Sequence, residues 1–140
     1  MLRRTTAIAA ALSLLALGSP LIAARANPSF VEYFNQGVER YNSGNYREAL
    51  ANYTKAIEIN PQDAEIYNYR GDAKHKLEDF QGAIADYTKA IEINPQYANA
   101  YVNRGIDREN ANDLKGACLD WRKAADLGKE NAAEWVKEQC

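Results

Sequence analysis

The sequence predicts an all-α protein in which short helical hairpins are repeated and stacked. The ten residues YTKAIEINPQ occur at positions 53–62 and again at 87–96, an offset of 34 residues. A weaker copy follows at the same interval, since DYTKA at 86–90 returns as DWRKA at 120–124. Similar stretches at a fixed separation of this size indicate supersecondary units that stack on one another. We therefore expect three units, at residues 30–63, 64–97 and 98–128, the last with a degenerate end.

Each unit is expected to contain two helices joined by a turn. In the first unit Ala49, Tyr53 and Ala56 follow the i, i+4, i+7 spacing of one helix face. The Asn-Pro pairs at 60–61 and 94–95 end that helix, because proline lacks a backbone N–H and disfavours a helical residue before it. Breaks at 43–45, 78–79 and 112–113 separate it from an earlier helix of about 12–14 residues. Asn45 and Glu48 have the spacing of a capping box at the second helix.

Small residues recur at positions where two helices are expected to touch. Glycines stand at 37, 71 and 105, alanines at 49, 83 and 117, and large aromatic residues at 53, 87 and 121. Gly and Ala allow two antiparallel helices to approach closely, and the aromatic rings can fill the space beside them. We expect these three series to form the core of the stack.

Two polar series repeat every 34 residues as well. One series is Gln36, Arg70 and Arg104, and the other, 16 residues downstream, is Asn52, Asp86 and Asp120. The neutral Gln occurs with a neutral Asn, and each Arg occurs with an Asp. We expect each pair to join the two helices of a unit or to reach the next unit, because an unpaired buried charge is costly. The alternative is that both series are solvated.

The repeated residues resemble the tetratricopeptide repeat (TPR), a 34-residue helical hairpin with aromatic, Gly, Ala and Pro residues at fixed positions. Unit one matches with Tyr33, Gly37, Tyr46, Ala49, Tyr53, Ala56 and Pro61, and unit two with Tyr67, Gly71, Phe80, Ala83, Tyr87, Ala90 and Pro95. Unit three has Tyr101, Gly105, Leu114, Ala117, Trp121 and Ala124, but Lys129 replaces the closing proline. The resemblance implies a TPR-type right-handed superhelix of three helix-turn-helix repeats.

In this family the first helices of the units line a concave groove that receives an extended peptide or a partner's helix. Carried over by position, the groove here would be lined by Phe34, Asn35, Val38, Asn68, Tyr69, Asp72, Asn99, Val102, Asn103 and Ile106. Asn side chains can both donate to and accept from a peptide backbone, and the apolar residues can form pockets. The alternative is a solvated surface that binds no partner.

One subset of the family binds the C-terminal carboxylate of chaperones through cationic side chains on this surface. The corresponding positions here are the neutral residues Phe34, Val38, Tyr69, Asn99 and Asn103. Recognition of an acidic chaperone tail is therefore not predicted.

Residues 129–140 are predicted to form a C-terminal capping helix. An open repeat stack leaves its last apolar face uncovered, and terminal elements normally cover it. Gly128 opens the turn into this segment, and Trp135 is the expected anchor against the third unit.

Cys118 and Cys140 are the only two cysteines of the chain. They could lie close together if the last repeat helix and the capping helix run antiparallel about Gly128. An intramolecular disulfide is expected, because disulfides persist outside the cytosol. Free thiols and an intermolecular bond remain the alternatives.

Residues 1–26 have the three parts of a secretory signal peptide. Arg3 and Arg4 give a positive start, residues 7–17 are apolar, and Ala24-Arg25-Ala26 fits a cleavage site. We expect cleavage after Ala26 and export to the periplasm, an equivalent extracytosolic lumen or the medium. The alternative is an uncleaved anchor, although the apolar run is shorter than the roughly 20 residues of a spanning helix.

The charge balance disfavours nucleic acid and anionic lipid as partners. The chain has 17 basic and 19 acidic residues, and three of the basic residues but none of the acidic ones lie in residues 1–26. The remainder therefore has a net charge of −5, which gives little attraction for phosphates. No membrane insertion is expected after cleavage of the signal.

The sequence contains no recognisable catalytic, metal or cofactor motif. His75 is the only histidine and is flanked by Lys74 and Lys76 near a helix end, so it is expected to be solvated or to interact with the helix C-terminus. Two cysteines and one histidine do not form a zinc spacing, and the glycines are scattered rather than gathered in a phosphate-binding loop. We predict neither an enzyme nor a cofactor.

The sequence supports two hypotheses of function. The first is a non-enzymatic scaffold or adaptor outside the cytosol that binds a protein or peptide partner in its groove. The second is a self-associating structural subunit of an exported or membrane-peripheral assembly, because Phe30, Val31 and Phe34 are apolar at the uncapped N-terminal end.

Overall fold

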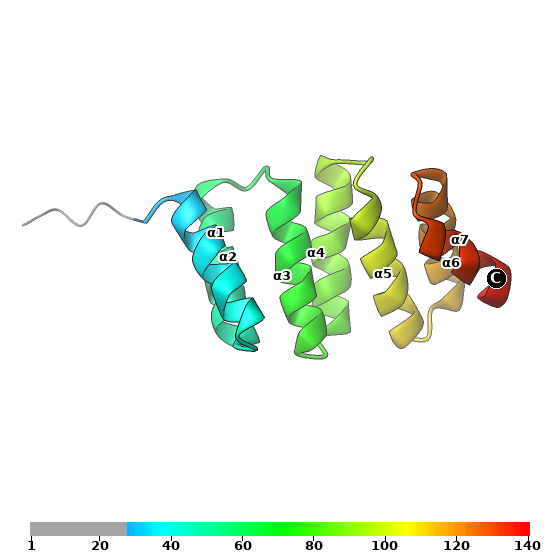
Figure 1. Ribbon diagram of the computed structural model, residues 1–140, viewed down its shortest axis with the longest axis horizontal. Coiled ribbons are helices and arrows are strands. Elements are labelled where there is room, and N and C mark those ends of the chain that lie inside the picture. Colours follow the sequence, from blue (N-terminus) through cyan, green and yellow to red (C-terminus); the bar gives the residue numbers. More distant parts are fainter. Residues whose placement is uncertain (1–27) are drawn as a thin grey trace, which may run out of the picture.

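The computed structural model describes residues 28–140, and within them the chain forms helices without any β-strand. The helices are α1 (Phe30–Asn42), α2 (Tyr46–Ile59), α3 (Ala64–Lys76), α4 (Phe80–Ile93), α5 (Ala98–Asn110), α6 (Leu114–Asp126) and α7 (Glu130–Gln139). Figure 1 shows them following one another along the long axis of the molecule. The predicted all-α superhelix of three hairpins and a C-terminal helix is confirmed. The predicted signal peptide, residues 1–26, lies outside the described residues.

The turn inside each hairpin uses a backbone conformation that L-residues rarely adopt. Gly44, Glu78 and Asn112 stand at equivalent positions, and their φ angles are 78°, 61° and 63°. Gly reaches this region without steric cost, and Asn tolerates it better than Glu does. The turn geometry is therefore retained in the second unit despite an unfavourable residue.

The connection between hairpins is also repeated. Asn60 and Asn94 end their helices in an extended conformation, immediately before proline. The hydroxyl of Tyr67 donates to the carbonyl oxygen of Pro61 at 3.1 Å, and Tyr101 makes the same bond to Pro95 at the same distance. These bonds fix the start of the next hairpin relative to the end of the previous one.

Each hairpin is held by an aromatic ring that lies against a glycine. Tyr53, Tyr87 and Trp121 are at most 1% exposed. A Cβ atom added at Gly71 would lie 2.5 Å from Cε1 of Tyr87. Added Cβ atoms at Gly37 and Gly105 would meet Tyr53 and Trp121 in the same way. The glycines are therefore required for the close approach of the two helices, as the sequence predicts.

The predicted capping box at Asn45 and Glu48 is wrong. Asn45 precedes α2, but its side chain makes no capping hydrogen bond, and Glu48 pairs with Arg40 at 3.2 Å. In the two later hairpins the residue equivalent to Glu48 is Gly82 or Gly116, and each donates its N–H to the preceding Asp cap. The backbone N–H of Asn45 donates to the carbonyl oxygen of Arg40 at 2.8 Å, so it is not available to the Glu48 carboxylate, as a capping box requires. The structure has a capping box elsewhere, at Ser29 and Glu32 before α1.

The predicted pairing of Arg and Asp inside hairpins is confirmed. Arg70 donates from Nε and Nη2 to the two carboxylate oxygens of Asp86, at 2.9 and 2.7 Å. Arg104 binds Asp120 with the same two distances. Each Arg–Asp pair therefore has two parallel, charge-assisted hydrogen bonds between the first and the second helix of its hairpin. Both carboxylates are buried.

Asp86 and Asp120 each contact a second cationic side chain, and the paired Arg residues also contact the preceding unit. Lys74 lies 2.8 Å from Asp86, and Arg108 lies 2.8 Å from Asp120. Arg70 and Arg104 also donate to Thr54 and Thr88, at 3.3 and 3.1 Å. The Thr residues belong to the second helix of the previous unit, so these bonds join units as well as helices.

The neutral pair of the first unit does not behave in the same way. Asn52 donates instead to the carbonyl oxygen of Glu48 in its own helix, at 3.0 Å, and Gln36 is exposed. The expectation that this pair joins the helices is therefore wrong. A neutral Gln and Asn carry no charge, so leaving them unpaired at a partly buried site costs less than leaving an Arg and an Asp unpaired.

The last helix, α7, packs on α6 through Trp135. Its ring centroid lies 5.4 Å from that of Trp121, and both rings belong to the apolar cluster of the third unit. The structure also joins Cys118 of α6 to Cys140 by a disulfide, with Cα atoms 5.8 Å apart. The ring contact holds the middle of α7 against the third unit, and the disulfide holds its C-terminal end.

Candidate functional site

The candidate site is the face formed by the first helices of the hairpins, α1, α3 and α5, which we call the first-helix face. The ten residues predicted to line a groove all lie on these helices. Helix α1 carries Phe34, Asn35 and Val38, α3 carries Asn68, Tyr69 and Asp72, and α5 carries Asn99, Val102, Asn103 and Ile106. The structure divides most of them among an aromatic region, a central pocket and a set buried between helices, whereas Asn35 and Asn99 are exposed.

Two of the ten residues contribute little to an open surface. Asn68 is 6% exposed and Val102 is 8% exposed. Val102 belongs to the apolar cluster of the third unit, and Asn68 accepts a hydrogen bond from Asn103 Nδ2 at 3.2 Å. Both residues lie beneath the first-helix face, because neighbouring repeats pack against them.

The N-terminal part of the face is aromatic. Tyr69 of α3 makes an edge-on contact with Phe34 of α1, with ring centroids 5.1 Å apart. It also lies 5.9 Å from Tyr53, and Phe30 stacks on Phe34 at 6.2 Å. Phe34 and Tyr69 are half-buried, so parts of both rings are available to a partner.

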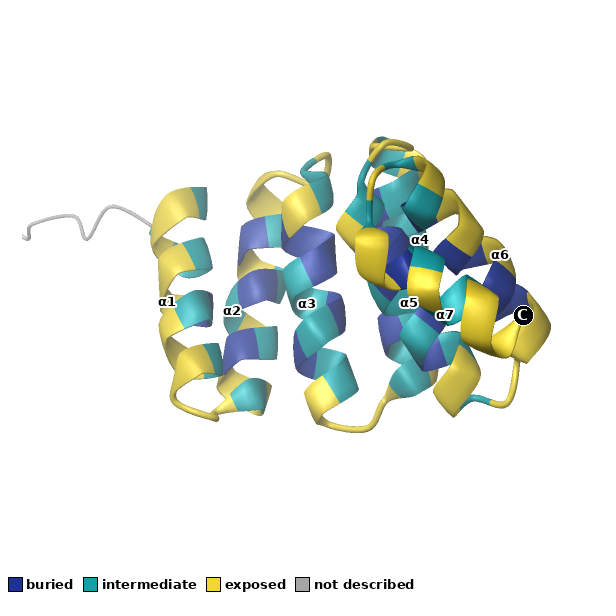
Figure 2. Ribbon diagram, turned by 45° about the vertical axis from the view of Figure 1, so that its right-hand side comes forward, coloured by how far each residue is buried: buried dark blue, intermediate teal, exposed yellow. Residues whose placement is uncertain are grey.

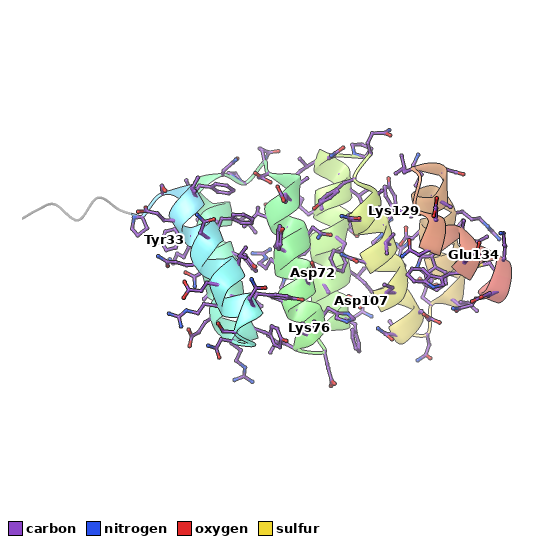
Figure 3. All side chains as sticks on the ribbon, in the orientation of Figure 1. Tyr33, Asp72, Lys76, Asp107, Lys129 and Glu134 are labelled. Atoms are coloured by element: carbon purple, nitrogen blue, oxygen red, sulfur yellow. A yellow bond between two sulfur atoms is a disulfide. The ribbon has the colours of Figure 1, made fainter. Side chains whose placement is uncertain are left out.

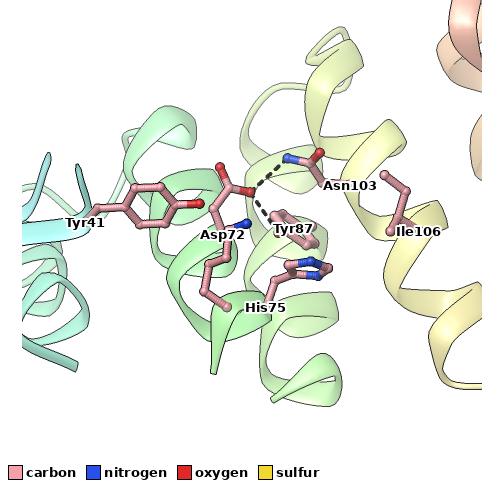
Figure 4. A pocket seen from close by; sticks show the side chains of 7 residues that line it. Tyr41, Asp72, His75, Tyr87, Asn103 and Ile106 are labelled. Carbon is pink, nitrogen blue, oxygen red and sulfur yellow. Dashed lines mark hydrogen bonds between the residues drawn. The ribbon is translucent and has the colours of Figure 1, made fainter. Parts of the chain in front are cut away.

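The centre of the face is hollowed. A pocket of about 260 Å³, here called the Asp72 pocket, is lined by Tyr41, Asp72, His75, Lys76, Tyr87, Asn103 and Ile106. Figure 4 shows the Asp72 carboxylate between the Tyr41 ring on one side and Asn103 and Tyr87 on the other. The lining therefore comes from all three first helices and from α4.

The Asp72 carboxylate accepts its two short hydrogen bonds on one of its two oxygens. Oδ1 accepts from the Tyr87 hydroxyl at 2.8 Å and from Asn103 Nδ2 at 2.9 Å. Oδ2 accepts a longer bond from Asn68 Nδ2 at 3.4 Å. Burial raises the pKa of the Asp72 carboxyl to about 6, while the Tyr87 hydrogen bond and the His75 charge act in the opposite direction. Asn103 is thus already engaged and is not free to bind a peptide backbone through Nδ2.

His75 is not the solvated or capping residue that the sequence suggests. Its Nδ1 lies 2.5 Å from Oδ1 of Asp107, and its side chain is 34% exposed. Asp107 of α5 is 0% exposed, so it needs a hydrogen-bond donor, and His75 supplies one from the neighbouring α3. Burial raises the pKa of Asp107, and the hydrogen bond from His75 opposes that shift. Figure 3 shows Asp72 and Asp107 on the adjacent first helices α3 and α5.

A second hollow lies at the connections between hairpins. It has a volume of about 590 Å³, and its lining residues are Asn60, Gln62, Asp63, Ala64, Glu65, Ile93, Asn94, Tyr97 and Asn99. Burial raises the pKa of Tyr97 to about 12, with Glu65 acting in the same direction. Asn99 is exposed and belongs to this hollow rather than to the Asp72 pocket.

Four lining residues of the Asp72 pocket were not predicted. Three of them, Tyr41, His75 and Lys76, continue the helical stripes that pass through the predicted residues Val38 and Asp72 by three or four positions. Extending those stripes by one turn would have found them. Tyr87 belongs to α4 and reaches the pocket from below, so a stripe on the first helices could not have indicated it.

The described residues offer hydrogen bonding, ion pairing and apolar contact. Within residues 28–140, no group of three or more His, Cys, Asp or Glu side chains could hold a metal ion. No helix in the same part of the chain is long and apolar enough to cross a membrane. His75 is bonded to Asp107, and Cys118 is bonded to Cys140. His75 and Cys118 therefore do not form a nucleophile–base pair.

The buried and exposed parts of the repeats are distributed as a binding scaffold requires. Figure 2 shows the buried residues on the sides of α2, α3 and α5 that face neighbouring helices, whereas exposed residues dominate the hairpin turns. The packed core therefore fixes the positions of the first helices, and the partly exposed side chains of the first-helix face are presented on rigid elements.

Comparisons with known proteins agree with this architecture. The family described as TPR repeat matches residues 37–78 and 71–106, whereas curated proteins give no match. The TPR domain of Arabidopsis OM64 is 31% identical with a TM-score of 0.76, covering 79% of this chain and 93% of that domain. The first TPR of Spaghetti (RPAP3), solved with the HSP90 peptide SRMEEVD, is 25% identical with a TM-score of 0.75, covering 79% and 89%.

The first TPR domain of human RPAP3 gives the same result, at 25% identity and a TM-score of 0.73, with 78% of this chain and 87% of that domain covered. Hairpin geometry, repeat length and sequence thus point to one family. The chain belongs to the tetratricopeptide repeat family.

Proposed function

We propose that this protein is an exported, non-enzymatic scaffold that holds a peptide segment or a partner's helix along the first-helix face. The observation that carries the proposal is the pocketed, partly aromatic surface that all three hairpins build together. A similar TPR domain, that of Spaghetti, is bound to a peptide, which supports protein or peptide as the class of partner. The histidine and the two cysteines of the described residues are engaged in bonds within the chain, which supports a role in binding rather than in catalysis through these residues.

The partner is expected to differ from an acidic chaperone tail. The HSP90 peptide bound by Spaghetti, SRMEEVD, is rich in Glu and Asp. On the present chain the five positions expected to carry cations for such a tail are neutral, and one of them, Asn103, is hydrogen-bonded to the Asp72 carboxylate. A carboxylate-rich peptide would therefore find little attraction at the centre of this face.

Export rests on two features of the chain. Residues 1–26 have the pattern of a cleaved signal peptide. A disulfide between Cys118 and Cys140 would persist in an oxidising compartment and not in a typical cytosol. The mass of the purified protein tests this proposal, because a chain that starts at Asn27 and carries no free thiol is expected. A protein that retains residues 1–26 in a membrane fraction would contradict it.

The binding face can be tested by a variant that removes two contacts without removing the fold. Replacing Tyr69 and Ile106 with Ala should lose about 1–2 kcal/mol of binding at each position if they are central to the interface. Both side chains are half-buried, so the fold should survive. Trp135→Ala is the matched control, because this half-buried aromatic residue lies on α7, away from the face.

The readout is the set of partner proteins that each variant captures when the exported fraction is crosslinked. The double variant is expected to lose partners that the parent and Trp135→Ala both capture. If it melts as the parent does and captures the same partners, the first-helix face is not the binding site.

Self-association is the second candidate function, and a specific observation favours it. Val31 is 58% exposed at the start of α1, beside the stacked rings of Phe30 and Phe34. Sedimentation of the mature protein separates the two functions. A stable monomer over a wide range of concentration would exclude self-association, whereas a dimer abolished by Val31→Asp would establish it.

A further inference from the structure

We propose that the Asp72 pocket receives a basic side chain, Lys or Arg, from the bound partner. This inference rests on the proposed function, since it names the chemistry that one subsite of the first-helix face recognises. The pocket combines a partly buried carboxylate with aromatic and aliphatic walls. A long side chain that ends in a cation matches both features, because its alkyl stem is apolar and its head is charged.

The carboxylate of Asp72 has spare capacity for a hydrogen-bond donor. Oδ1 accepts two short bonds, from Tyr87 and Asn103. Oδ2 accepts the 3.4 Å bond from Asn68 alone, although a carboxylate oxygen can accept two. The Asp72 carboxylate also makes no ion pair with any residue of the described chain, unlike Asp86 and Asp120. An ammonium or guanidinium group entering the pocket would supply the missing charge-assisted bond.

The neighbouring rings and the aliphatic wall suit the rest of such a side chain. Tyr41 and Tyr87 line the pocket from two different helices, and Ile106 closes it on the α5 side. Figure 4 shows the Tyr41 ring extended towards the Asp72 carboxylate. Aromatic faces attract cations, and they also accept the methylene groups of a Lys or Arg stem.

The other charged groups at the pocket decide how strongly it favours a cation. His75 and Lys76 of α3 line it, and Asp107 of α5 lies directly behind His75. Because His75 and Asp107 are bonded to each other, each reduces the influence of the other. Lys76 is exposed, so it can turn towards solvent, but in the pocket it would compete with an incoming cation. Removing the Lys76 charge should therefore strengthen the binding of a cation in the pocket.

Binding of a cation requires the ionised form of Asp72, so the pH dependence has a defined direction. Burial raises the pKa of Asp72 to about 6, which means that the carboxyl gains a proton between pH 7 and pH 5. The groups that face it are Tyr41 from α1, His75 and Lys76 from α3, Tyr87 from α4 and Asp107 from α5. Burial raises the pKa of Tyr41 and of Tyr87, so both phenols stay neutral. Affinity for a cation should fall as the pH falls.

The experiment uses three blocked pentapeptides, Ala-Ala-X-Ala-Ala, in which X is Lys, norleucine or Glu. They are titrated into isotope-labelled protein purified after expression of the full chain, and NMR shifts at Tyr41 and Asn103 report binding. At pH 7.5 the Lys peptide is expected to bind about three- to tenfold more tightly than the norleucine peptide. This ratio corresponds to the free energy of one partly exposed, charge-assisted hydrogen bond. Asp72→Asn should remove this difference, and Lys76→Gln should enlarge it about twofold or more.

Other outcomes overturn the inference in distinguishable ways. Equal binding of the Lys and norleucine peptides would show that the pocket does not recognise a cation, and the proposed scaffold function would stand. Tighter binding of the Glu peptide would assign the pocket to an anion held by Lys76 and His75. If no peptide shifts these resonances, the pocket is not a subsite, and the scaffold function depends on the partner-capture experiment alone.

If Asp72→Asn fails to fold, two arms of the test remain. The Lys76→Gln variant keeps Asp72, and the unaltered protein can be titrated between pH 5 and pH 7.5. A preference for the Lys peptide that does not weaken towards pH 5, and is not enlarged in Lys76→Gln, contradicts the inference.

Discussion

Replacing Asp72 with Asn should stabilise the fold at neutral pH, and the gain should depend on pH. The pKa of this carboxyl is raised from 3.8 to about 6 in the folded state. Between those values the folded protein binds a proton that the unfolded chain has lost. Raising the pH therefore favours unfolding, and the stability present below pH 3.8 is lost as the pH passes through about 6.

The size of the effect follows from the shift. A shift of about two units corresponds to about 3 kcal/mol between pH 3.8 and pH 7. Asp72 is half-buried, so solvent screening reduces this to about 1–2 kcal/mol. Asn has nearly the same shape, can still accept from Tyr87 and Asn103, and has no charge to desolvate.

Urea unfolding followed by circular dichroism at pH 4, 5, 6, 7 and 8 measures the difference between Asp72→Asn and the parent. The difference in unfolding free energy should grow in favour of Asn from pH 4 to about pH 6.5 and then stay constant. Asp126→Asn serves as the control, because it removes an exposed carboxylate away from the first-helix face. A difference that is flat with pH, or larger at pH 4 than at pH 7, would refute the reasoning. A stabilised variant that also loses the Lys peptide would identify Asp72 as a residue retained for binding rather than for folding.

Three further predictions concern the scaffold. Glu78→Gly should raise the unfolding free energy by about 0.5–1 kcal/mol, because Glu78 has φ of 61° where Gly44 stands in the first hairpin; an unchanged melting temperature would show that the turn is not strained. Gly71→Ala should destabilise by about 1–3 kcal/mol, since the added Cβ lies 2.5 Å from a ring atom of Tyr87, and chemical denaturation checks it. Replacing both disulfide cysteines with Ser should cost about 3 kcal/mol for a sequence separation of 22, a loss that reduction of the parent should reproduce.

The repeat architecture was predictable because the same packing constraint occurs in all three units of the sequence. Each glycine lies against an aromatic ring 16 residues downstream, as in Gly71 and Tyr87, so both series recur with the period. The Arg–Asp pairs were predictable for a similar reason, because Arg70 and Asp86 change together relative to the neutral residues of the first unit. Repetition within one chain shows which residues vary together.

Interactions that occur once gave no such signal. His75 binds Asp107 of the next hairpin, and neither neighbouring unit repeats this contact, so spacing could not indicate it. The failed capping box has a related cause, since the hydrogen bond from the Asn45 backbone N–H to the carbonyl oxygen of Arg40 depends on how the turn closes in three dimensions. The predicted groove residues were carried over by position from the family resemblance, but the hydrogen bonds that hold Asn68 and Asn103 to Asp72 depend on packing between helices.

The central claim is that the first-helix face holds the partner, and site-specific photo-crosslinking tests it most directly. A photoreactive residue is placed at Asn35 or Asn99, which are exposed on first helices, and in parallel at Ala51 or Ala85, which are exposed at equivalent positions of second helices. The account predicts that the first pair crosslinks to one partner protein, identified by mass spectrometry, and that the second pair does not. Crosslinks that form from Ala51 and Ala85 but not from Asn35 and Asn99 would contradict it.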